Sequence, residues 1–491
     1  MQPRVKHIIA YIACLLFLVC TKSEAAGDSP FIGSYAESIQ SFLDDKFADS
    51  NAGMVIGLVD EHESRAFSAG KLDYDTDQQV DGDTVFSLGS VTKVFTSLLT
   101  LDAERRGEVQ LGDPVAKHLP SGIYVPGHGE KSITLRTLAV QNSGLPFHAQ
   151  AMMDATDPET GKLDLRKFKK ASEAITAQDL YLTVSKFELK QTPGQAFQYS
   201  NVGMALLGNA IETRTENEYE SLIINRICEP LKMSDARIVL STEQKDRRVA
   251  GHLEDGSRVG HWNFQAMAPA GGLFNTANDM LKFLKAQVGL KQSALAVSMK
   301  KSHTIQHTDV PQFGKTATPW CDSGVYNPPG TELLGHAGHG FGGRAFVTFD
   351  VKNRRGVVVL TNQLKVYPNG IGWTLIQGMP FAPQNLRYAV REVEGIGFWL
   401  RPDLKSRMAR ILIVFPQSSA GRAGLTTDLL ISQINDVSVK GKTAAECNEL
   451  MTGPTGTLVN LELFNPADKA ISSMQLKKEK FLTITGQKQN R

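Results

Sequence analysis

The spacing of apolar residues along the chain predicts where helices and strands lie. Residues 54–59 and 65–70 are short apolar runs on either side of a polar turn, which indicates a pair of strands. Residues 90–106 repeat apolar side chains three and four positions apart, the spacing of an amphipathic helix. Related patterns predict further helices at 201–213, 276–287 and 371–378.

A second group of patterns divides the rest of the chain. Residues 344–350 and 356–361 flank a charged turn and predict an antiparallel hairpin, whereas residues 120–200 are rich in turns and short polar stretches. After a segment with two prolines the pattern changes to short strands alternating with turns. These strands are predicted at 411–415, 429–434 and 457–464, with one short helix at 444–451. The change predicts a second folded unit.

The first residues resemble an export signal. Arg4 and Lys6 precede an apolar run at 8–20, and small residues follow, with a cleavage site expected near Ala25. As a helix this run would reach only about 20 Å, too short to span a bilayer. Lipid attachment at Cys20 is disfavoured by the bulky residue before it. We therefore expect export to the periplasm or beyond the cell, with no membrane span after cleavage.

Composition narrows the class of protein. Of the 491 residues 41% are hydrophobic and 21% are charged, which excludes wholesale disorder. The net charge of +2 provides no basic field for nucleic acid. Signal cleavage would leave three cysteines, too few for a disulfide scaffold, and their spacing leaves open whether Cys228 and Cys321 pair. No histidine or cysteine cluster has metal-ligand spacing, so no metal or other cofactor is expected.

Candidate chemistry begins with a Ser-x-x-Lys pattern at Ser90 and Lys93. Residues three apart lie on one face of a helix, so the amine can reach the hydroxyl. A lysine in a dry site can lose its proton and activate the serine, which is otherwise a weak nucleophile. The same pattern at Ser68 and Ser298 does not open a helix of this kind. The alternative is that Ser90 is a plain helix cap.

Two further elements contain polar groups suited to catalysis. Tyr199-Ser200-Asn201 precedes a predicted helix, and a tyrosine beside a lysine can be held partly as phenolate and so carry a proton. The alternative is a buried tyrosine next to a helix cap. Residues 335–343 contain five glycines, which would let the backbone approach a ligand closely. The alternative there is a flexible loop with solvated histidines.

These elements, in this order, resemble the serine β-lactamase and penicillin-binding protein superfamily. The branch includes class C β-lactamases, D-alanyl-D-alanine carboxypeptidases, esterases and D-aminopeptidases. The resemblance covers roughly residues 30–380, including the Ser-Gly-Leu-Pro segment within 133–146. It implies an α+β fold, with an antiparallel sheet covered by helices and a helical subdomain that forms the other wall of the cleft.

The resemblance also implies a role for each matched residue. Ser90 would be the acylated nucleophile, and Lys93 and Tyr199 would share the work of general base and proton shuttle. Asn201 would orient Lys93 and the substrate amide. The mechanism implied is acyl transfer through a covalent acyl-enzyme that water then releases.

The glycine-rich segment differs from that of β-lactamases at one position that bears on the choice of substrate. His336 and Gly338 occupy the Lys/His-x-Gly positions, and the backbone N–H groups of Ser90 and His339 would form the oxyanion hole. β-Lactamases and most transpeptidases have lysine where this chain has His336. Imidazole is mostly neutral at neutral pH, which weakens carboxylate recognition. We therefore expect poor β-lactam turnover and a preference for ester, amide or D-amino-acid peptide substrates.

The C-terminal unit has a resemblance of its own. Gly395-Ile396-Gly397-Phe398 resembles the carboxylate-binding loop of PDZ domains, and residues 413–439 resemble their core. The resemblance implies a small β-barrel domain that adds a peptide ligand beside a strand. The alternative is that the unit only scaffolds the hydrolase.

The whole chain is thus expected to be an exported serine hydrolase with a peptide-binding or partner-binding module. Alternatives are a penicillin-binding D-alanyl-D-alanine carboxypeptidase or β-lactamase, and a binding protein of the same fold that lacks turnover. The expected segments are a signal peptide at 1–25, a hydrolase domain at 28–379, a linker at 380–388, a PDZ-like domain at 389–480 and a tail at 481–491.

Overall fold

The structure, a computed structural model, describes residues 29–486 apart from 49, 51, 157–163, 253–256, 261, 311–313, 322–332, 341, 365, 382–387, 404–405, 415–417 and 427–428. The predicted signal peptide and its cleavage site lie outside the described residues. Among the helices that are described, none combines the length and the apolar character needed to cross a membrane.

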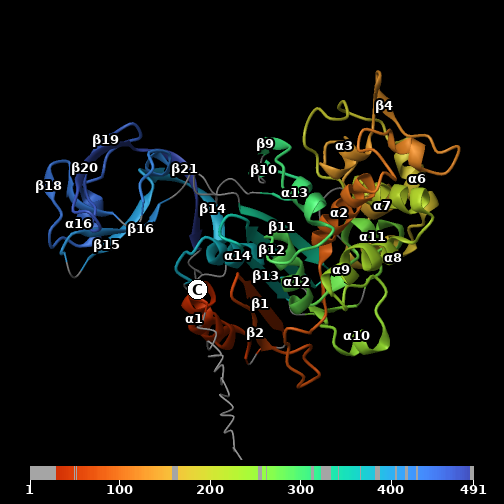
Figure 1. The fold of residues 1–491 in the computed structure, drawn as a ribbon, viewed down its shortest axis with the longest axis horizontal. Helices are drawn as coiled ribbons and strands as arrows, with labels where there is room; N and C mark the ends of the chain where they lie inside the picture. Colours follow the sequence, from red (N-terminus) through yellow and green to blue (C-terminus); the bar gives the residue numbers. More distant parts are fainter. Residues whose placement is uncertain are drawn as a thin grey trace, which may run out of the picture.

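A five-stranded antiparallel sheet forms the centre of the larger unit, in the order β11-β12-β13-β1-β2 (Figure 1). The two strand pairs predicted from the sequence are both present in it, and β1 joins them by pairing with β13. The strands are β1 (Gly53–Val59), β2 (Ser64–Gly70), β11 (Leu333–Gly340), β12 (Gly343–Asp350) and β13 (Arg355–Thr361). Thus the glycine-rich segment before the predicted hairpin is an edge strand as far as Gly340, and not a flexible loop.

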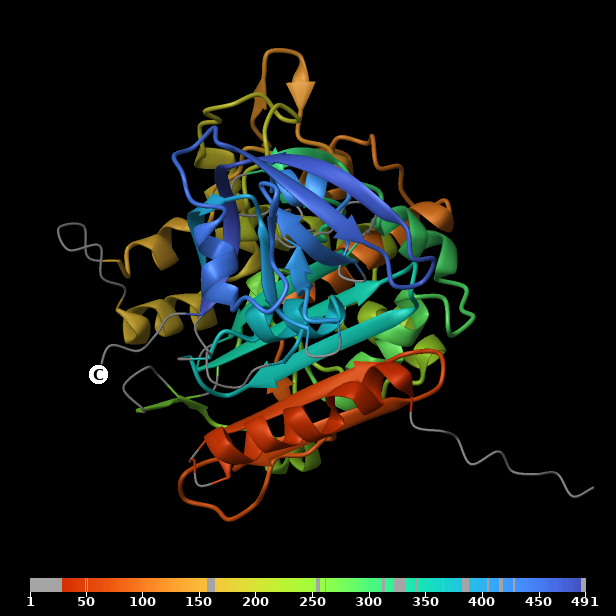
Figure 2. The same cartoon turned by 90° about the vertical axis from the view of Figure 1, so that its left-hand side faces the viewer.

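Helices cover both faces of this sheet, which is why β1 is buried along its whole length. Met54, Ile56 and Leu58 point into the core shared with α1 (Pro30–Phe47) and α14 (Pro368–Ile376). The alternate residues Val55 and Val59 point to the opposite core, to which α12 (Ala277–Gln287) also contributes. This alternation follows from the two-residue period of a strand. Figure 2 shows α1 lying along the sheet.

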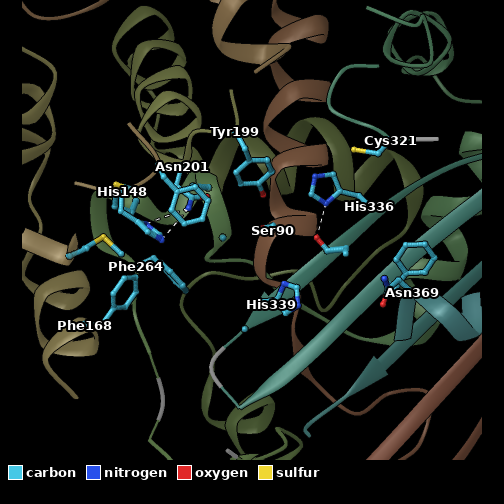
Figure 3. A pocket seen from close by; sticks show the side chains of 18 of the residues that line it. Ser90, His148, Phe168, Tyr199, Asn201, Phe264, Cys321, His336, His339 and Asn369 are labelled. Carbon is cyan, nitrogen blue, oxygen red and sulfur yellow. Dashed lines mark hydrogen bonds between the residues drawn. The ribbon is translucent and has the colours of Figure 1, made fainter. Parts of the chain in front are cut away.

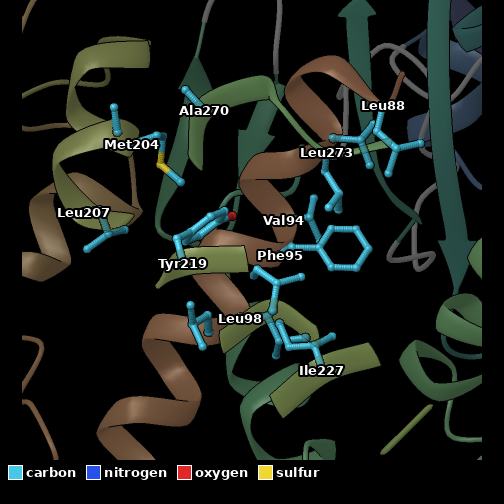
Figure 4. Close-up of a cluster of buried hydrophobic side chains, with 14 of the residues drawn as sticks. Leu88, Val94, Phe95, Leu98, Met204, Leu207, Tyr219, Ile227, Ala270 and Leu273 are labelled. Carbon is cyan, nitrogen blue, oxygen red and sulfur yellow. The ribbon is translucent and has the colours of Figure 1, made fainter. Parts of the chain in front are cut away.

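Helix α2 (Thr92–Arg105) lies at the centre of the second core. It contacts α7 (Asn201–Thr215), α11 (Ala268–Gly271) and α13 (Ala296–Ser302), and Figure 4 shows the apolar side chains packed around it. Every residue from Thr92 to Ala103 is buried. The prediction of an amphipathic helix was therefore wrong in one respect, because helices also cover the polar face.

The region predicted as turns contains several short helices that the sequence reading missed. They form the helical part of the fold, on the far side of α2 from the sheet (Figure 1). Three of them begin with side-chain caps, from Thr134 before α3, Asp164 before α5 and Thr176 before α6, which were the available local signals. These helices are α3 (Leu135–Ala139), α4 (Gln150–Met153), α5 (Leu165–Ala174) and α6 (Ala177–Lys186). Three short helices further along the chain were not predicted either: α8 (Tyr219–Ile223), α9 (Glu229–Leu231) and α10 (Thr242–Asp246).

The C-terminal unit has its own sheet and its own hydrophobic core. The strand order is β15-β16-β17-β19-β20, with β18 paired to β17, so the predicted strands and the predicted helix are confirmed. The elements are β15 (Phe398–Pro402), β16 (Ala409–Val414), α15 (Ser419–Arg422), β17 (Leu430–Ile434), β18 (Val437–Ser438), α16 (Ala444–Glu449), β19 (Leu458–Phe464) and β20 (Ile471–Lys477).

Two expectations for this unit need correction. In the part of it that is described, β15 and β20 do not pair, so the sheet is open and is no closed barrel. The expected tail also begins too early, because β21 (Glu479–Gly486) pairs with β14 (Tyr388–Gly395) in a two-stranded ribbon. The unit therefore begins within one residue of the start inferred from sequence, whereas β21 carries it past the inferred end at 480.

A buried amide connects the ends of two central strands and provides a test of the fold. Asn362 accepts a hydrogen bond from the Gly53 N–H (2.7 Å) and donates to the carbonyls of Leu72 (3.2 Å) and Ala250 (2.9 Å). Replacing it with alanine removes three buried hydrogen bonds, although the Leu72 carbonyl still accepts one from the Ala250 N–H, so Asn362→Ala should cost about 3 kcal/mol of unfolding free energy. Chemical denaturation measures this. The exposed Asn225→Ala should change it by less than about 0.5 kcal/mol, and equal effects would contradict the assignment.

Candidate active site

Ser90 lies in a short 3-10 turn, Gly89–Val91, that leads directly into α2. The Nζ atom of Lys93 donates a hydrogen bond to Oγ of Ser90 at 2.9 Å and another to the carbonyl of Ala270 at 2.5 Å. No side chain caps α2, so the alternative of Ser90 as a plain helix cap does not hold. The hydroxyl faces the buried amine instead.

The environment of Lys93 decides what this contact can do. The side chain is completely buried, and burial lowers its pKa well below the ordinary 10.5. Burial is the only cause of this shift, and among the described residues no carboxylate lies close enough to Nζ to form an ion pair with it. A buried amine in this position favours its neutral form, because charge is costly away from water. It can therefore accept a proton from the neighbouring hydroxyl.

Tyr199 completes the group on the other side of Ser90. Its side chain lies beside Ser90 (Figure 3), and its hydroxyl hydrogen-bonds with that residue. Nζ of Lys93 lies 4.8 Å from the centre of its ring. Burial raises the pKa of Tyr199 above its ordinary 10, and the bond with Ser90 opposes this only in part. This shift favours the neutral phenol over the expected partial phenolate. The phenol keeps its proton and can relay one.

Asn201 lies at the start of α7, at the edge of the same site. Its side-chain amide donates toward Nδ1 of His148 at 3.4 Å, and its backbone N–H bonds to the carbonyl of Phe147 at 3.0 Å. The expected contact between Asn201 and Lys93 is not formed, because the Ala270 carbonyl takes that place. The amide remains next to the cavity, where a substrate can reach it.

His148 is a residue of this site that the sequence reading missed. Burial, together with the nearby Lys93, lowers its pKa to about 4, so the imidazole is neutral near pH 7. Its ring packs edge-on against Phe168 at 5.0 Å. In the sequence, the only feature that could have pointed to His148 as a site residue is its position two residues after the Ser-Gly-Leu-Pro segment.

His336 lies on β11, the edge strand that faces Ser90 (Figure 3). Its Nδ1 donates a hydrogen bond to the carbonyl of Ala337 at 2.8 Å, which leaves the lone pair on Nε2. Burial, and secondarily Lys93, lowers the pKa of His336 to about 3. The ring is therefore a neutral hydrogen-bond acceptor and holds no charge for a carboxylate.

Close backbone packing brings β11 against the Ser90 turn. A Cβ atom on Gly338 would lie 1.9 Å from the carbonyl oxygen of Leu88, and one on Gly89 would lie 2.8 Å from the nitrogen of His339. Only glycine fits at either position. The backbones of Ser90 and His339 consequently run side by side, as an oxyanion hole requires. The side chain of His339 is exposed and accepts a hydrogen bond from Arg344 at 3.1 Å.

A cavity of about 720 Å³ opens over these groups. Its lining includes Ser90, Tyr199, Asn201, His336 and His339, so the sequence-predicted residues of the hydrolase domain are brought together. No aspartate, glutamate, lysine or arginine contributes to the lining among the described residues. The described part of the chain also contains no group of three or more histidine, cysteine or acidic side chains placed so that it could hold a metal ion. The cavity presents uncharged polar groups around one nucleophile.

The remaining predicted residues lie elsewhere. Gly395, Ile396, Gly397 and Phe398 connect β14 to β15 in the C-terminal unit, and none of them lines this cavity. Cys228, Cys321 and Cys447 are each free thiols, which answers the open question of pairing. Cys321 is the one that reaches the cavity, next to β11.

A serine, a buried lysine and a phenol that meet between a helical region and an edge strand define a class of serine hydrolase, the β-lactamases and penicillin-binding proteins. The family model described as beta-lactamase matches residues 40–375, and the chain belongs to this family.

Among curated proteins, the chain is 27% identical over 258 residues to the D-alanyl-D-alanine-carboxypeptidase/endopeptidase AmpH of Escherichia coli K12, covering 51% of this chain and 61% of that protein. It is 24% identical over 296 residues to Protein flp of Staphylococcus aureus N315, covering 60% of this chain and 56% of that protein. The chain thus spans about three fifths of the length of these relatives.

Solved structures of low sequence identity share the fold. One is a β-lactamase/D-alanine carboxypeptidase from Yersinia pestis complexed with citrate, with a TM-score of 0.57, 21% identity, and coverage of 70% of this chain and 99% of that one. The octameric penicillin-binding protein homologue from Pyrococcus abyssi has a TM-score of 0.59 and 20% identity, and the match covers 91% of this chain and 99% of that one.

The glycine contact at β11 yields a direct test of the geometry. Gly338→Ala places a methyl group against the Leu88 carbonyl and must move β11 away from Ser90. A shift of about 1 Å should lower kcat/KM for an activated ester about a hundredfold. Gly112→Ala is the matched control, because a Cβ there meets nothing within 4 Å. A folded Gly338→Ala enzyme with wild-type kcat/KM would contradict the role given to this contact.

Proposed function

We propose that this protein is a serine hydrolase that forms an acyl-enzyme on Ser90 and acts on ester, amide or D-amino-acid-containing peptide substrates. The observation that carries the proposal is the 2.9 Å contact between Ser90 and a buried amine with a lowered pKa. A hydroxyl in such a contact can be deprotonated as it attacks, so the nucleophile is activated only when it is needed.

The proposed reaction proceeds in two steps. Oγ of Ser90 attacks the substrate carbonyl carbon while its proton moves to Lys93, directly or through the phenol of Tyr199. The backbone N–H groups of Ser90 and His339 hold the oxyanion, and the amide of Asn201 contacts the substrate. The proton then passes to the leaving group. Water attacks the acyl-enzyme in the second step, with the same groups accepting its proton.

The neutral state of His336 shapes the choice of substrate. A carboxylate bound at this position would face a lone pair on Nε2 and a cavity lined without cations. Burying an unpaired carboxylate is costly, so substrates without a charge at this point are favoured. We therefore propose slow turnover of β-lactams and of peptides whose terminal carboxylate must bind here, which ranks the carboxypeptidase and β-lactamase alternatives second.

The alternative of a binding protein without turnover is opposed by the polar groups themselves. Ser90, Lys93 and Tyr199 are all present and contact one another. A buried lysine lowers the free energy of unfolding, and a cavity that only binds a ligand would not need such a lysine.

A panel of esters, amides and D-amino-acid peptides tests the proposed function. Wild type should hydrolyse at least one class, and Ser90→Ala should lose at least a thousandfold in kcat on that substrate, since only the nucleophile is removed. Circular dichroism checks that the variant is folded. A variant that keeps wild-type activity would exclude Ser90 as the nucleophile.

His336→Lys tests the origin of the substrate choice. A cation at this position can bond to the carboxylate of benzylpenicillin, and a hydrogen bond to a charged group contributes about 1.5–3 kcal/mol. The rate constant for acylation by benzylpenicillin should therefore rise about ten- to a hundredfold relative to that for a neutral ester. The exposed His62→Lys should leave the ratio unchanged. An unchanged ratio in His336→Lys would mean that this residue does not set the choice.

For the C-terminal unit we propose PDZ-like peptide binding. In the described residues β15 pairs only with β16, and α16 packs beside it, so a peptide strand could add between them. Gly397 has φ +95°, and a Cβ there would lie 1.8 Å from Ser418, so the loop that precedes β15 requires glycine. Export, supported by the predicted signal peptide, would place both units outside the cytoplasm.

Peptide binding can be measured on the full chain. A library of peptides with free C-terminal carboxylates is titrated by fluorescence anisotropy, and the same sequences with amidated ends serve as controls. Binding that requires the free carboxylate is the expected result. If no peptide binds, or amidated peptides bind equally well, the unit is better regarded as a scaffold.

A further inference from the structure

The wall of the cavity on the Asn201 side is built from aromatic and methionine side chains. Phe168 and Phe264 lie on this side in Figure 3, together with His148, away from His336 and Cys321. Phe147 and Met153 line the same wall although they are 49% and 43% exposed. Large apolar side chains left open at a cavity lose hydrophobic stabilisation that a bound apolar group would restore.

This apolar wall continues into a second cavity of about 800 Å³ among helices α4, α5 and α6. The two cavities share Phe147, His148 and Met153, so they adjoin along these residues. Leu182, on α6, lines the outer cavity and is 46% exposed. Large apolar side chains thus line a path from the neighbourhood of Ser90, past Met153, to Leu182.

The charges of the outer cavity lie on α6. Asp179 and Lys186 contribute to its lining, whereas the inner cavity has no charged lining residue among those described. Met153 lets the wall adjust to the ligand, because an unbranched thioether side chain can repack around ligands of different length. A peptide would leave its backbone amides without partners along such a wall, whereas an aliphatic chain would leave nothing unsatisfied.

We infer that the substrate of the Ser90 site carries a long aliphatic chain, which lies over Phe147 and Met153 and extends to Leu182. This inference rests on the proposed function and names its substrate class: esters or amides with a fatty acyl or fatty alkyl group. The chain is bound on the Asn201 side, and the reacting carbonyl lies at Ser90.

A homologous series of substrates tests this inference. Each buried methylene contributes about 0.8 kcal/mol, which corresponds to about a fourfold rise in kcat/KM. One arm uses p-nitrophenyl esters of fatty acids from acetate upward, and the other uses acetate esters of alcohols of increasing length, all below their micelle concentrations. In at least one arm, kcat/KM should keep rising up to the long chains. The arm that shows this rise tells whether the acyl group or the alcohol group is bound. No rise in either arm would overturn the inference.

Two variants locate the chain along the path. Leu182→Lys places a charge in the outer cavity and should flatten the rise only for the longest chains. Met153→Lys, closer to Ser90, should flatten it from shorter chains onward. The control is Val297→Lys on α13, a large apolar side chain that is 68% exposed and lines neither cavity. It should keep the wild-type chain-length profile.

The outcomes separate this inference from the proposed function. If activity depends on Ser90 but shows no dependence on chain length, the hydrolase assignment holds and the aliphatic site is wrong. If Met153→Lys and Leu182→Lys behave like Val297→Lys while wild type shows the rise, the chain binds elsewhere and the inference is again wrong. If Ser90→Ala hydrolyses the short esters as wild type does, the proposed function itself fails.

Discussion

The burial of one amine is the constraint on which the site depends. Lys93 lies at the first turn of α2 with no contact to water, and the carbonyl of Ala270 and the hydroxyl of Ser90 are its hydrogen-bond acceptors. A charged ammonium in this place would cost several kcal/mol, so the fold favours the neutral amine. The same burial keeps Tyr199 protonated and His336 neutral. Burial from water thus accounts for three properties of the site: Lys93 can act as a base, Tyr199 can relay a proton, and the cavity is uncharged.

The rest of the fold maintains this burial. Helix α2 is enclosed by other helices, among them α7, α8, α11 and α13, so its polar residues must bond within the core. Thr96, for example, donates to the carbonyl of Pro269 at 2.6 Å. The glycine contacts between β11 and the Ser90 turn then close the site from the sheet side. Movement of either element would admit water and allow Lys93 to become charged.

Much of the fold and of the candidate active site could be predicted from the sequence. The three motifs named the nucleophile, the lysine and the glycine-rich strand, because each needs particular residue types at fixed spacing. Strand pairs such as β12 and β13 were predictable from local alternation. The full burial of α2 was not, since it depends on helices distant in the sequence. His148 and the contact of Lys93 with Ala270 could not be found either, because tertiary packing alone brings them to the site.

The central claim is that a buried, neutral Lys93 activates Ser90, and covalent labelling tests it most directly. A fluorophosphonate is reacted with the protein over a range of pH, and the labelled residue is located by mass spectrometry of its peptides. The account predicts a label on Ser90 whose rate of formation rises with pH and reaches its plateau well below the ordinary lysine pKa of 10.5. Labelling at another residue, or a rate that still rises through that pKa, would contradict it.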